Sequence, residues 1–477
     1  MRISQRDFFL AEATLRGRYA RGGFVNLDDT IIAIATPSGR GGIGVVRLAG
    51  PHSKPIAVRM LHLSEERVLE ANRAVFGELI EIDTGERIDD VVVTFFAAPH
   101  SYTTDDIVEI SCHGSPVVLH RVLEIAITQG ARLAEPGEFT QRAFLNGRLD
   151  LTQAEAVRDL IDAQTIYQAK VAARQLKGSL SRVVLPMKEK LIALIARLEA
   201  GIDFAEDDVA VMPPDQILPV VEDLIELLRR LDESFAFGKV VHEGLTLAIV
   251  GRPNVGKSSL FNRLVESERA IVTALPGTTR DLVTETVALG GIPVRLVDTA
   301  GIREAMDEAE NIGIRKSMEA LADADLVLVV LDASDELSAV DRELLADVAN
   351  RAAIVVDNKA DLGARAHQLS VANLPTIRTS AVTGEGIAAL RAQILRTVRG
   401  SATEDGGAML TNLRQQGLVR SALEGLGAAA SSVRNATPHE MVLLDLYCAL
   451  RALDELTGAT TADDILNLIF STFCIGK

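Results

Sequence analysis

The chain has 477 residues, enough for about three domains, and 48% of them are hydrophobic, as in proteins that fold around buried cores. Its formal net charge of −17 excludes nonspecific nucleic-acid binding through bulk positive charge, so an RNA partner would need a local basic patch or a helper protein. No apolar run approaches the roughly 20 residues of a membrane-spanning helix, and we expect no membrane association.

Residues 1–28 contain five arginines, a pattern that faintly suggests an organelle transit peptide. Asp7, Glu12 and the scarcity of serine argue against that interpretation. We therefore expect a disordered N-terminal extension on a bacterial, cytoplasmic protein, with a mitochondrial location as the alternative. The three cysteines show neither paired spacing nor a metal-ligand pattern, which fits a reducing cytosol: Cys112, Cys448 and Cys474.

Residues 29–147 favour a small α+β domain. From Thr30 a strand, a glycine-rich turn and a second strand predict a hairpin. A strand rather than a helix follows these glycines, so we reject a dinucleotide-binding site at this point. Further strand-like runs lie at 74–82, 90–96 and 107–112, and a helical pattern follows at 116–129.

Long amphipathic helices are predicted on both sides of a central α/β segment. Before that segment, apolar residues such as Leu191 and Leu194 recur every three or four positions, and the same periodicity returns after it. We therefore expect one discontinuous helical domain, 148–242 and 401–477, with a further domain inserted at 243–400. In the inserted domain, strand-like runs alternate with helical patterns, which predicts a mostly parallel sheet with helices on both faces.

A phosphate loop follows the first strand of the inserted domain. Gly251 and Gly256 are separated by four residues and followed by Lys257 and Ser258, which is the Walker A spacing. Glycines let backbone N–H groups close around phosphates, the lysine adds a mobile cation, and the Ser258 hydroxyl can ligate Mg²⁺. A helix that begins at the loop adds the positive end of its dipole.

Further motifs follow in the order that a GTPase requires. GTTRD at 277–281 would bring Thr279 to Mg²⁺ and the γ-phosphate. DTAG at 298–301 would place Asp298 near Mg²⁺, through water, and the Gly301 N–H near the γ-phosphate. Together with the phosphate loop, these motifs predict a Ras-like P-loop G domain.

Guanine specificity is expected from NKAD at 358–361. The Asp361 carboxylate can accept both N–H groups that guanine offers and adenine lacks, and the Lys359 stem can lie along the base. A backbone amide at Ser380 or Ala381 would meet the guanine oxygen. The predicted GTP-binding residues are Asn254, Val255, Gly256, Lys257, Ser258, Ser259, Thr273, Ala274, Leu275, Pro276, Gly277, Thr278, Thr279, Asp298, Thr299, Ala300, Gly301, Asn358, Lys359, Asp361, Ser380 and Ala381.

Hydrolysis requires a different water-positioning group from that of Ras-like enzymes, because Ile302 follows DTAG where those enzymes carry a glutamine. Arg303 and Glu310 lie downstream and are the candidate catalytic residues, with Glu310 positioning water directly or through a second water. On the residues alone, the alternative for Glu310 is a solvated charge in an acidic segment.

The nucleotide motifs, the tail FCIGK at 473–477 and the segment PGEFTQRAFLNGRLDL at 136–151 resemble the MnmE (TrmE) family of tRNA wobble-uridine modification GTPases. The resemblance runs from about Thr30 to Lys477. It implies a homodimer formed through folate-binding-like N-terminal domains, tRNA as substrate, and an FAD-dependent MnmG partner in a heterotetramer. The pair would add a (carboxymethyl)aminomethyl group to C5 of the wobble uridine, with 5,10-methylene- or 5-formyl-tetrahydrofolate as the one-carbon source.

The resemblance also implies how the nucleotide site works. A K⁺ ion would neutralise charge between the β- and γ-phosphates in place of an arginine finger. Glu310 matches the family's catalytic glutamate. The positions that match K⁺ ligands are Asn254, Thr273, Leu275 and Thr278.

For folate, the matching positions are Arg47, Glu109, Arg148 and Lys477. A carboxylate suits the paired N–H donors of a pterin ring, and cations suit the acidic tail of folate. Arg148 stands where the family commonly has Lys, so charge is kept but donor geometry changes. Cys474 matches the family cysteine, either as a nucleophile or as a small residue that packs the tail.

Three functions remain to be compared. The first is a K⁺-dependent GTPase whose cycle drives folate-dependent tRNA modification. The second is a GTPase switch in ribosome or RNA assembly without modification chemistry, a class that typically carries a basic RNA-binding module. The third is a GTP-dependent scaffold whose N-terminal domain only dimerises.

Overall fold

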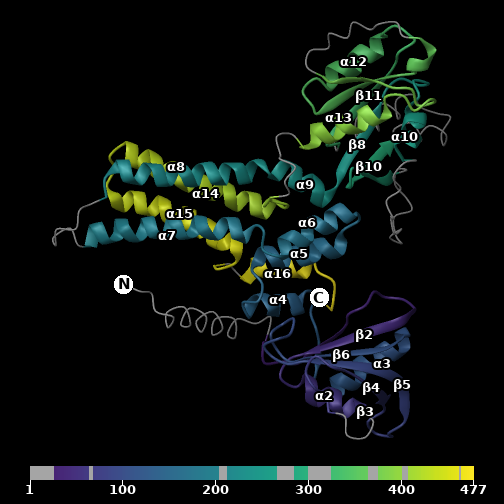
Figure 1. Cartoon of the computed structure of the whole chain (residues 1–477), viewed down its shortest axis with the longest axis vertical. Helices are drawn as coiled ribbons and strands as arrows, with labels where there is room; N and C mark the ends of the chain where they lie inside the picture. The colour runs from purple at the N-terminus through teal and green to yellow at the C-terminus, as the bar shows by residue number, and fades with distance from the viewer. Residues whose placement is uncertain are drawn as a thin grey trace. The chain divides into compact units, whose positions relative to one another are not determined.

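The computed structural model describes residues 26–63, 68–203, 212–265, 284–298, 324–363, 374–399, 407–460 and 463–476. The chain forms two compact units (Figure 1). Unit 1 combines the residues up to Arg158 with those from Thr457 onward, and unit 2 is Asp159–Leu456. Among the described helices, none combines the length and apolar character needed to cross a membrane.

Unit 1 is built on a mixed sheet whose described strands follow the order β3-β4-β5-β6-β2-β1-β7. All neighbouring strands in this order are antiparallel except β1 and β7, which are parallel. The predicted hairpin is confirmed, because β1 and β2 pair with Ile31 opposite Ala49. The strands are β1 (Ile31–Ile34), β2 (Gly41–Ala49), β3 (Leu61–Leu63), β4 (Ala74–Ile80), β5 (Arg87–Phe96), β6 (Ile107–Gly114) and β7 (Arg132–Leu133).

Helices cover both faces of this sheet. Successive side chains of β1 point to opposite faces, and each set packs into a different core. Ile32 packs with α2 (Ser53–Met60) and α3 (Pro116–Thr128). Ile31 packs on the other face against Phe139 of α4 (Glu138–Leu145). From α4 the chain continues into α5 (Leu151–Asp162), and α16 (Asp463–Ser471) returns to contact α4.

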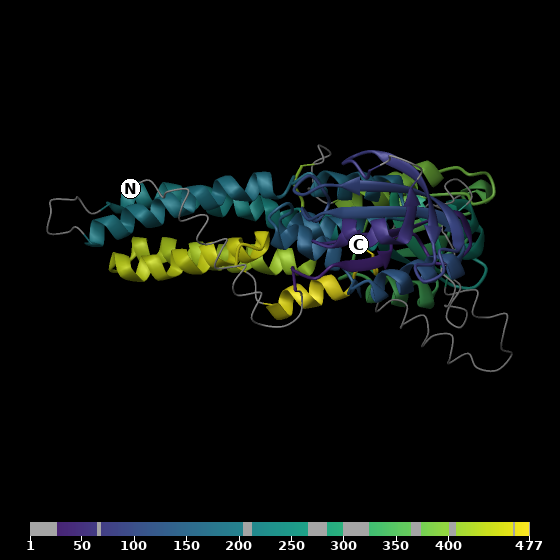
Figure 2. The same cartoon turned by 90° about the horizontal axis from the view of Figure 1, so that it is seen from below.

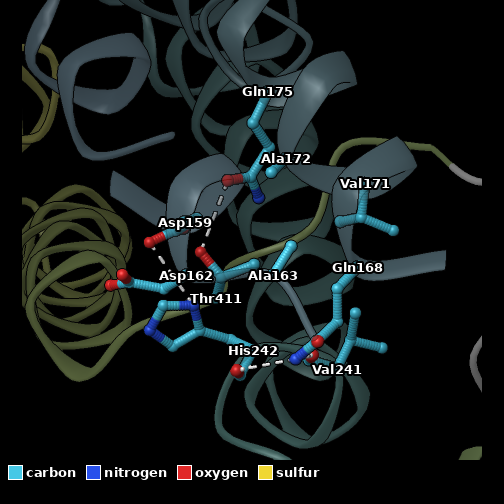
Figure 3. A pocket seen from close by; sticks show the side chains of 10 residues that line it. All are labelled: Asp159, Asp162, Ala163, Gln168, Val171, Ala172, Gln175, Val241, His242 and Thr411. Atoms are coloured by element: carbon cyan, nitrogen blue, oxygen red, sulfur yellow. Dashed lines mark hydrogen bonds and ion pairs between the residues drawn. The ribbon is translucent and has the colours of Figure 1, made fainter. Parts of the chain in front are cut away.

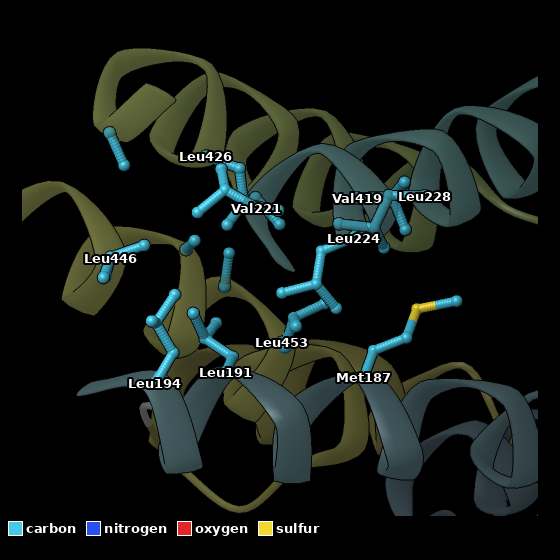
Figure 4. Packing of buried hydrophobic residues seen from close by; sticks show 14 of the residues in the cluster. Met187, Leu191, Leu194, Val221, Leu224, Leu228, Val419, Leu426, Leu446 and Leu453 are labelled. Carbon is cyan, nitrogen blue, oxygen red and sulfur yellow. The ribbon is translucent and has the colours of Figure 1, made fainter. Parts of the chain in front are cut away.

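The helical part of unit 2 takes helices from both sides of the inserted segment. Leu191, Leu224, Leu426 and Leu453 come from four different helices and share one buried core (Figure 4). In Figure 2 the blue-teal and yellow helices lie alongside one another. A discontinuous helical domain is therefore present. Its helices are α6 (Ile166–Leu176), α7 (Ser181–Asp203), α8 (Pro214–Glu233), α14 (Leu413–Arg434) and α15 (His439–Thr457).

The inserted α/β domain has a sheet whose described strands follow the order β13-β12-β11-β8-β10-β9. Its neighbouring strands are parallel, as predicted, except for the antiparallel pair of β9 and β10. The strands are β8 (Leu245–Val250), β9 (Thr284–Leu289), β10 (Ile292–Asp298), β11 (Leu326–Asp332), β12 (Ala353–Asn358) and β13 (Thr376–Arg378).

Helices cover both faces of this second sheet, as the alternation of strand and helix predicts. Leu328 of β11 packs into a core with α10 (Lys257–Val265) and α13 (Ile387–Arg399). Its neighbour Val329 packs on the opposite face with α12 (Ala339–Asp347). The strands buried on both sides thus place their carboxyl ends, where the predicted motifs lie, at one edge of the sheet.

Candidate functional site

The phosphate loop joins β8 to α10, and neighbouring atoms leave no room for a Cβ at either of its two glycines. A Cβ on Gly251 would lie 2.3 Å from the Val330 carbonyl oxygen. A Cβ on Gly256, which has φ +94°, would lie 2.4 Å from the Asn358 amide nitrogen. Asn254 has φ 64°, a left-handed conformation that asparagine tolerates better than most residues. The residue types at these three positions are therefore the ones that the backbone conformation of the loop favours.

The two basic side chains of this loop, Lys257 and Arg252, each bond oxygen atoms of the protein. The Lys257 ammonium donates to the carbonyl oxygens of Gly251, at 2.9 Å, and Arg252, at 2.8 Å. The Arg252 guanidinium in turn bonds Asp341, which is 1% exposed and caps α12. Ser258 lies exposed on the first turn of α10, which places its hydroxyl beside the loop.

Asn358 connects the phosphate loop to the predicted guanine-binding segments. This side chain is 1% exposed. Its amide donates to the Val255 carbonyl at 2.9 Å, and its carbonyl oxygen accepts from the Ala381 N–H at 3.1 Å and the Thr379 hydroxyl at 3.2 Å. One buried residue thus brings three separate predicted motifs together.

Lys359 is oriented by a carboxylate that the sequence did not single out. Its ammonium donates to Asp332, at the end of β11, at 2.7 Å. Burial disfavours the Asp332 carboxylate, but the hydrogen bonds from Lys359 and Ser334 outweigh it and lower the pKa below its usual value. Asp361 is exposed beside this pair, on a short 3₁₀ turn (Ala360–Leu362).

Several predicted site residues lie outside the described residues. Asp298 ends strand β10, and only its backbone is described. The others are Thr273, Ala274, Leu275, Pro276, Gly277, Thr278, Thr279, Thr299, Ala300, Gly301, Arg303, Glu310 and Lys477.

The predicted folate residues that the structure describes lie together in unit 1. Arg47 of β2 and Glu109 of β6 are register partners, and the guanidinium bonds the carboxylate at 2.7 and 2.9 Å. The Arg47 guanidinium also lies 5.6 Å from the ring centre of Phe139 and 5.7 Å from that of Tyr102. Arg148 lies over the same Tyr102 ring, at 5.7 Å.

A buried charge cluster supports this region. Glu138, which is fully buried, accepts hydrogen bonds from Arg132 at 2.7 and 2.8 Å and from the equally buried Arg142 at 2.9 Å. Burial opposes ionisation of Glu138, but the Arg132 hydrogen bonds and the further donors outweigh it and lower the pKa. Arg142 also donates to the backbone carbonyls of Asn26 and Asp29, so the cluster ties α4 to the residues before β1.

The C-terminal tail packs against the same unit. A Cβ on Gly476 would lie 2.4 Å from the Ile34 carbonyl oxygen of β1. Cys474 is exposed in this tail, whereas burial raises the pKa of Cys112 to about 12. Of these two thiols, only the one in the tail is accessible to reagents in solution.

A pocket lies where α5, α6 and α9 (Phe235–Glu243) meet within unit 2 (Figure 3). The Gln168 side chain donates to the backbone carbonyls of Val241 at 2.8 Å and His242 at 3.1 Å. The Thr165 hydroxyl bonds the Gly291 carbonyl between β9 and β10. These bonds join the start of α6 to the segment that leads into β8 and to the sheet itself.

Two protein-family models match the chain. One, described as "GTP-binding protein TrmE N-terminus", matches residues 30–148, and one described as "MnmE helical domain" matches residues 151–474. The chain belongs to the MnmE (TrmE) family. A relative from Koribacter versatilis named "tRNA modification GTPase MnmE" is 66% identical over 458 residues, covering 95% of this chain and 100% of the relative.

An MnmE relative from Aquifex aeolicus is 45% identical, with 94% of this chain and 100% of the relative covered. Among solved structures, the G domain of the T. maritima FeoB iron transporter is 25% identical over 32% of this chain and 98% of that chain, with a TM-score of 0.25. The Ras-like fold of the inserted domain is therefore supported by its strand order and its phosphate loop.

The architecture that the MnmE resemblance implied is confirmed: an N-terminal α+β domain, a discontinuous helical domain and an inserted Ras-like G domain. The residue-by-residue assignments and the predicted domain boundaries stay predictions. Sequence reasoning missed Asp332 and Tyr102, since neither belongs to a motif and each is recognised only by the charged groups around it.

Proposed function

We propose that this chain is a GTP-hydrolysing tRNA modification enzyme. In this proposal GTP binds at the phosphate loop, and Asp361 and the Ala381 amide recognise guanine. The main support is Asn358, whose three hydrogen bonds join the phosphate loop to both guanine segments.

Hydrolysis would depend on Mg²⁺ and K⁺, which supply positive charge at the phosphates when bound. Ser258 and Thr279 would hold Mg²⁺, and of these two Ser258 lies within the described residues. Asn254 fits a K⁺ site because its side chain is exposed on the loop and its backbone is already left-handed. Thr273, Leu275 and Thr278 would complete that site, and Glu310 would position water with help from Arg303.

The modification chemistry would take place on tRNA with an MnmG-like FAD protein as partner, in a complex built on a homodimer. A 5,10-methylene- or 5-formyl-tetrahydrofolate would bind at Arg47, Glu109, Arg148 and Lys477. The Arg47–Glu109 pair supports this assignment, because it holds an acceptor for pterin N–H groups beside a fixed cation. The product would carry a (carboxymethyl)aminomethyl group at C5 of the wobble uridine.

A depleted strain tests this function directly. tRNA from bacteria that lack the protein should lose the modified wobble uridine, and the wild-type chain should restore it, as measured by mass spectrometry of the nucleosides. Glu109→Gln should restore it poorly while its purified protein hydrolyses GTP at the normal rate. If the depleted strain instead contains as much modified wobble uridine as the parent strain, the result would favour a GTPase switch without modification chemistry.

A further inference from the structure

We propose that Tyr102 is a positioning residue of the unit 1 site, where its ring holds the guanidinium groups of Arg47 and Arg148 for one acidic ligand. The inference rests on the proposed folate function and goes beyond it, because it assigns the alignment of both cations to a single aromatic side chain. No motif of the sequence indicated this residue.

The geometry around the ring is specific. The Arg47 and Arg148 guanidinium carbons each lie 5.7 Å from the Tyr102 ring centre, within the range of cation–π attraction. Arg47 is held further by Phe139 and by Glu109. Glu109 balances the charge of Arg47, whereas Arg148 brings a second positive charge to the same ring, so the arrangement fits a site that receives a further carboxylate.

The position of the ring is fixed at both ends. The Tyr102 hydroxyl lies 3.0 Å from the hydroxyl of Thr140, which is fully buried in α4. On the backbone side, Ser101 and Thr103 are both buried, and the Asn146 amide donates to the Thr103 carbonyl at 2.6 Å. A ring held in this way can orient the mobile side chains that lie over it.

Arg148 is the cation that depends most on the ring. It is exposed, and among the described residues it forms no ion pair with a carboxylate. Its planar guanidinium can stack on an aromatic face, which an ammonium group does less well. Arg148 is therefore available to an incoming anion, and Tyr102 keeps it from sampling other directions.

The experiment measures 5-formyl-tetrahydrofolate binding to the full-length protein by calorimetry. Tyr102→Leu should weaken binding at least ten-fold, whereas Tyr102→Phe, which keeps the ring, should stay within about three-fold of the wild type. Arg148→Gln alone should also weaken binding. The double variant Tyr102→Leu with Arg148→Gln should lose less than the product of the two single losses, because both changes disrupt the same arrangement.

The β1 amides should exchange with solvent at the wild-type rate in all these variants, which would show that unit 1 is still folded. Wild-type affinity in Tyr102→Leu, or losses that simply multiply in the double variant, would overturn the role of Tyr102 while leaving the folate site standing. Absence of binding to the wild-type protein would overturn the folate function and this inference together.

Discussion

At the scale of single residues, Asn254 of the phosphate loop contributes both a backbone conformation and a side-chain amide. Asn254 combines a left-handed backbone with an exposed amide, so the effects of shape and of chemistry can be separated by substitution. Glycine at this position keeps the backbone conformation and removes the amide, whereas alanine disfavours the conformation as well.

We expect Asn254→Gly to bind GTP with near-normal affinity but to lose most of the difference in turnover between K⁺ and Na⁺ buffers. Asn254→Ala should show the same loss together with weaker binding, because alanine lacks the short polar side chain that lets asparagine tolerate φ near +64°. Phosphate release in each buffer gives the rates. A wild-type enzyme with equal rates in both buffers would remove the cation mechanism, and K⁺ stimulation that persists in Asn254→Gly would exclude Asn254 as a ligand.

We propose that Asp332 acts on the nucleotide through Lys359, from which it accepts a hydrogen bond. An acid whose folded pKa lies below its unfolded value, near 3.9, stabilises its partner above that value and loses the effect only as pH falls through the folded pKa. The pair is therefore intact throughout the range from pH 5 to 8.

Asp332→Asn should weaken GTP and GDP binding equally, by about five-fold, as expected for one partly exposed ion pair. The loss should be the same at pH 5.5 and 7.5 in a fluorescent-nucleotide titration. Asp335→Asn is a matched control, because Asp335 is 61% exposed and contacts Arg252 only at 3.4 Å. A loss confined to GTP would assign Asp332 to the γ-phosphate instead of the base.

At the scale of secondary-structure elements, α4 organises the site of unit 1. It supplies Phe139 beneath Arg47, Thr140 against Tyr102, and Glu138 in the buried charge cluster. Gly137, with φ 70°, precedes α4 and lies against the Phe470 carbonyl of α16, so no larger residue fits there. The segment that carried the family resemblance is therefore a structural junction as well as a motif.

Removing the carboxylate of this cluster should be costly. Glu138→Ala leaves the guanidinium of the fully buried Arg142 without its acid, and should lower the free energy of unfolding of unit 1 by about 3–5 kcal/mol. Hydrogen exchange of the β1 amides measures the change. Glu135→Ala, at an exposed neighbour, should alter it by less than about 0.5 kcal/mol. Equal exchange in the two variants would contradict this account.

The elements that sequence reasoning missed lack the apolar patterns that reveal helices and buried strands. In α4, charged and polar side chains such as Glu138 and Arg142 are buried in place of an apolar stripe, so helical periodicity does not reveal it. Strand β13 has only three residues, and β9 pairs antiparallel at the edge of the sheet. The fully buried strands β8, β11 and β12 were predicted, because burial on both faces requires an uninterrupted apolar run.

For the molecule as a whole, local motifs indicate the candidate nucleotide site, whereas no local motif indicates the candidate site of unit 1. The phosphate loop is a continuous stretch, so its spacing alone specifies its chemistry. Arg47, Tyr102 and Arg148 come from distant parts of the chain and meet only through the pairing of β2 with β6 and the packing of α4. Only the family resemblance indicated Arg47 and Arg148, and nothing in the sequence indicated Tyr102.

Unit 1 draws its elements from both parts of the chain that flank unit 2. Gly137 rests on α16 and Ile34 lies against Gly476, so these contacts can form only after residues 463–476 have been synthesised. The strands of the inserted sheet are all made earlier and can pair while translation continues. The G domain can thus mature on the ribosome, and the two cores around the sheet of unit 1 can also form early, because their residues all precede 140. Only the contacts with α16 and the tail must wait for residues 463–476.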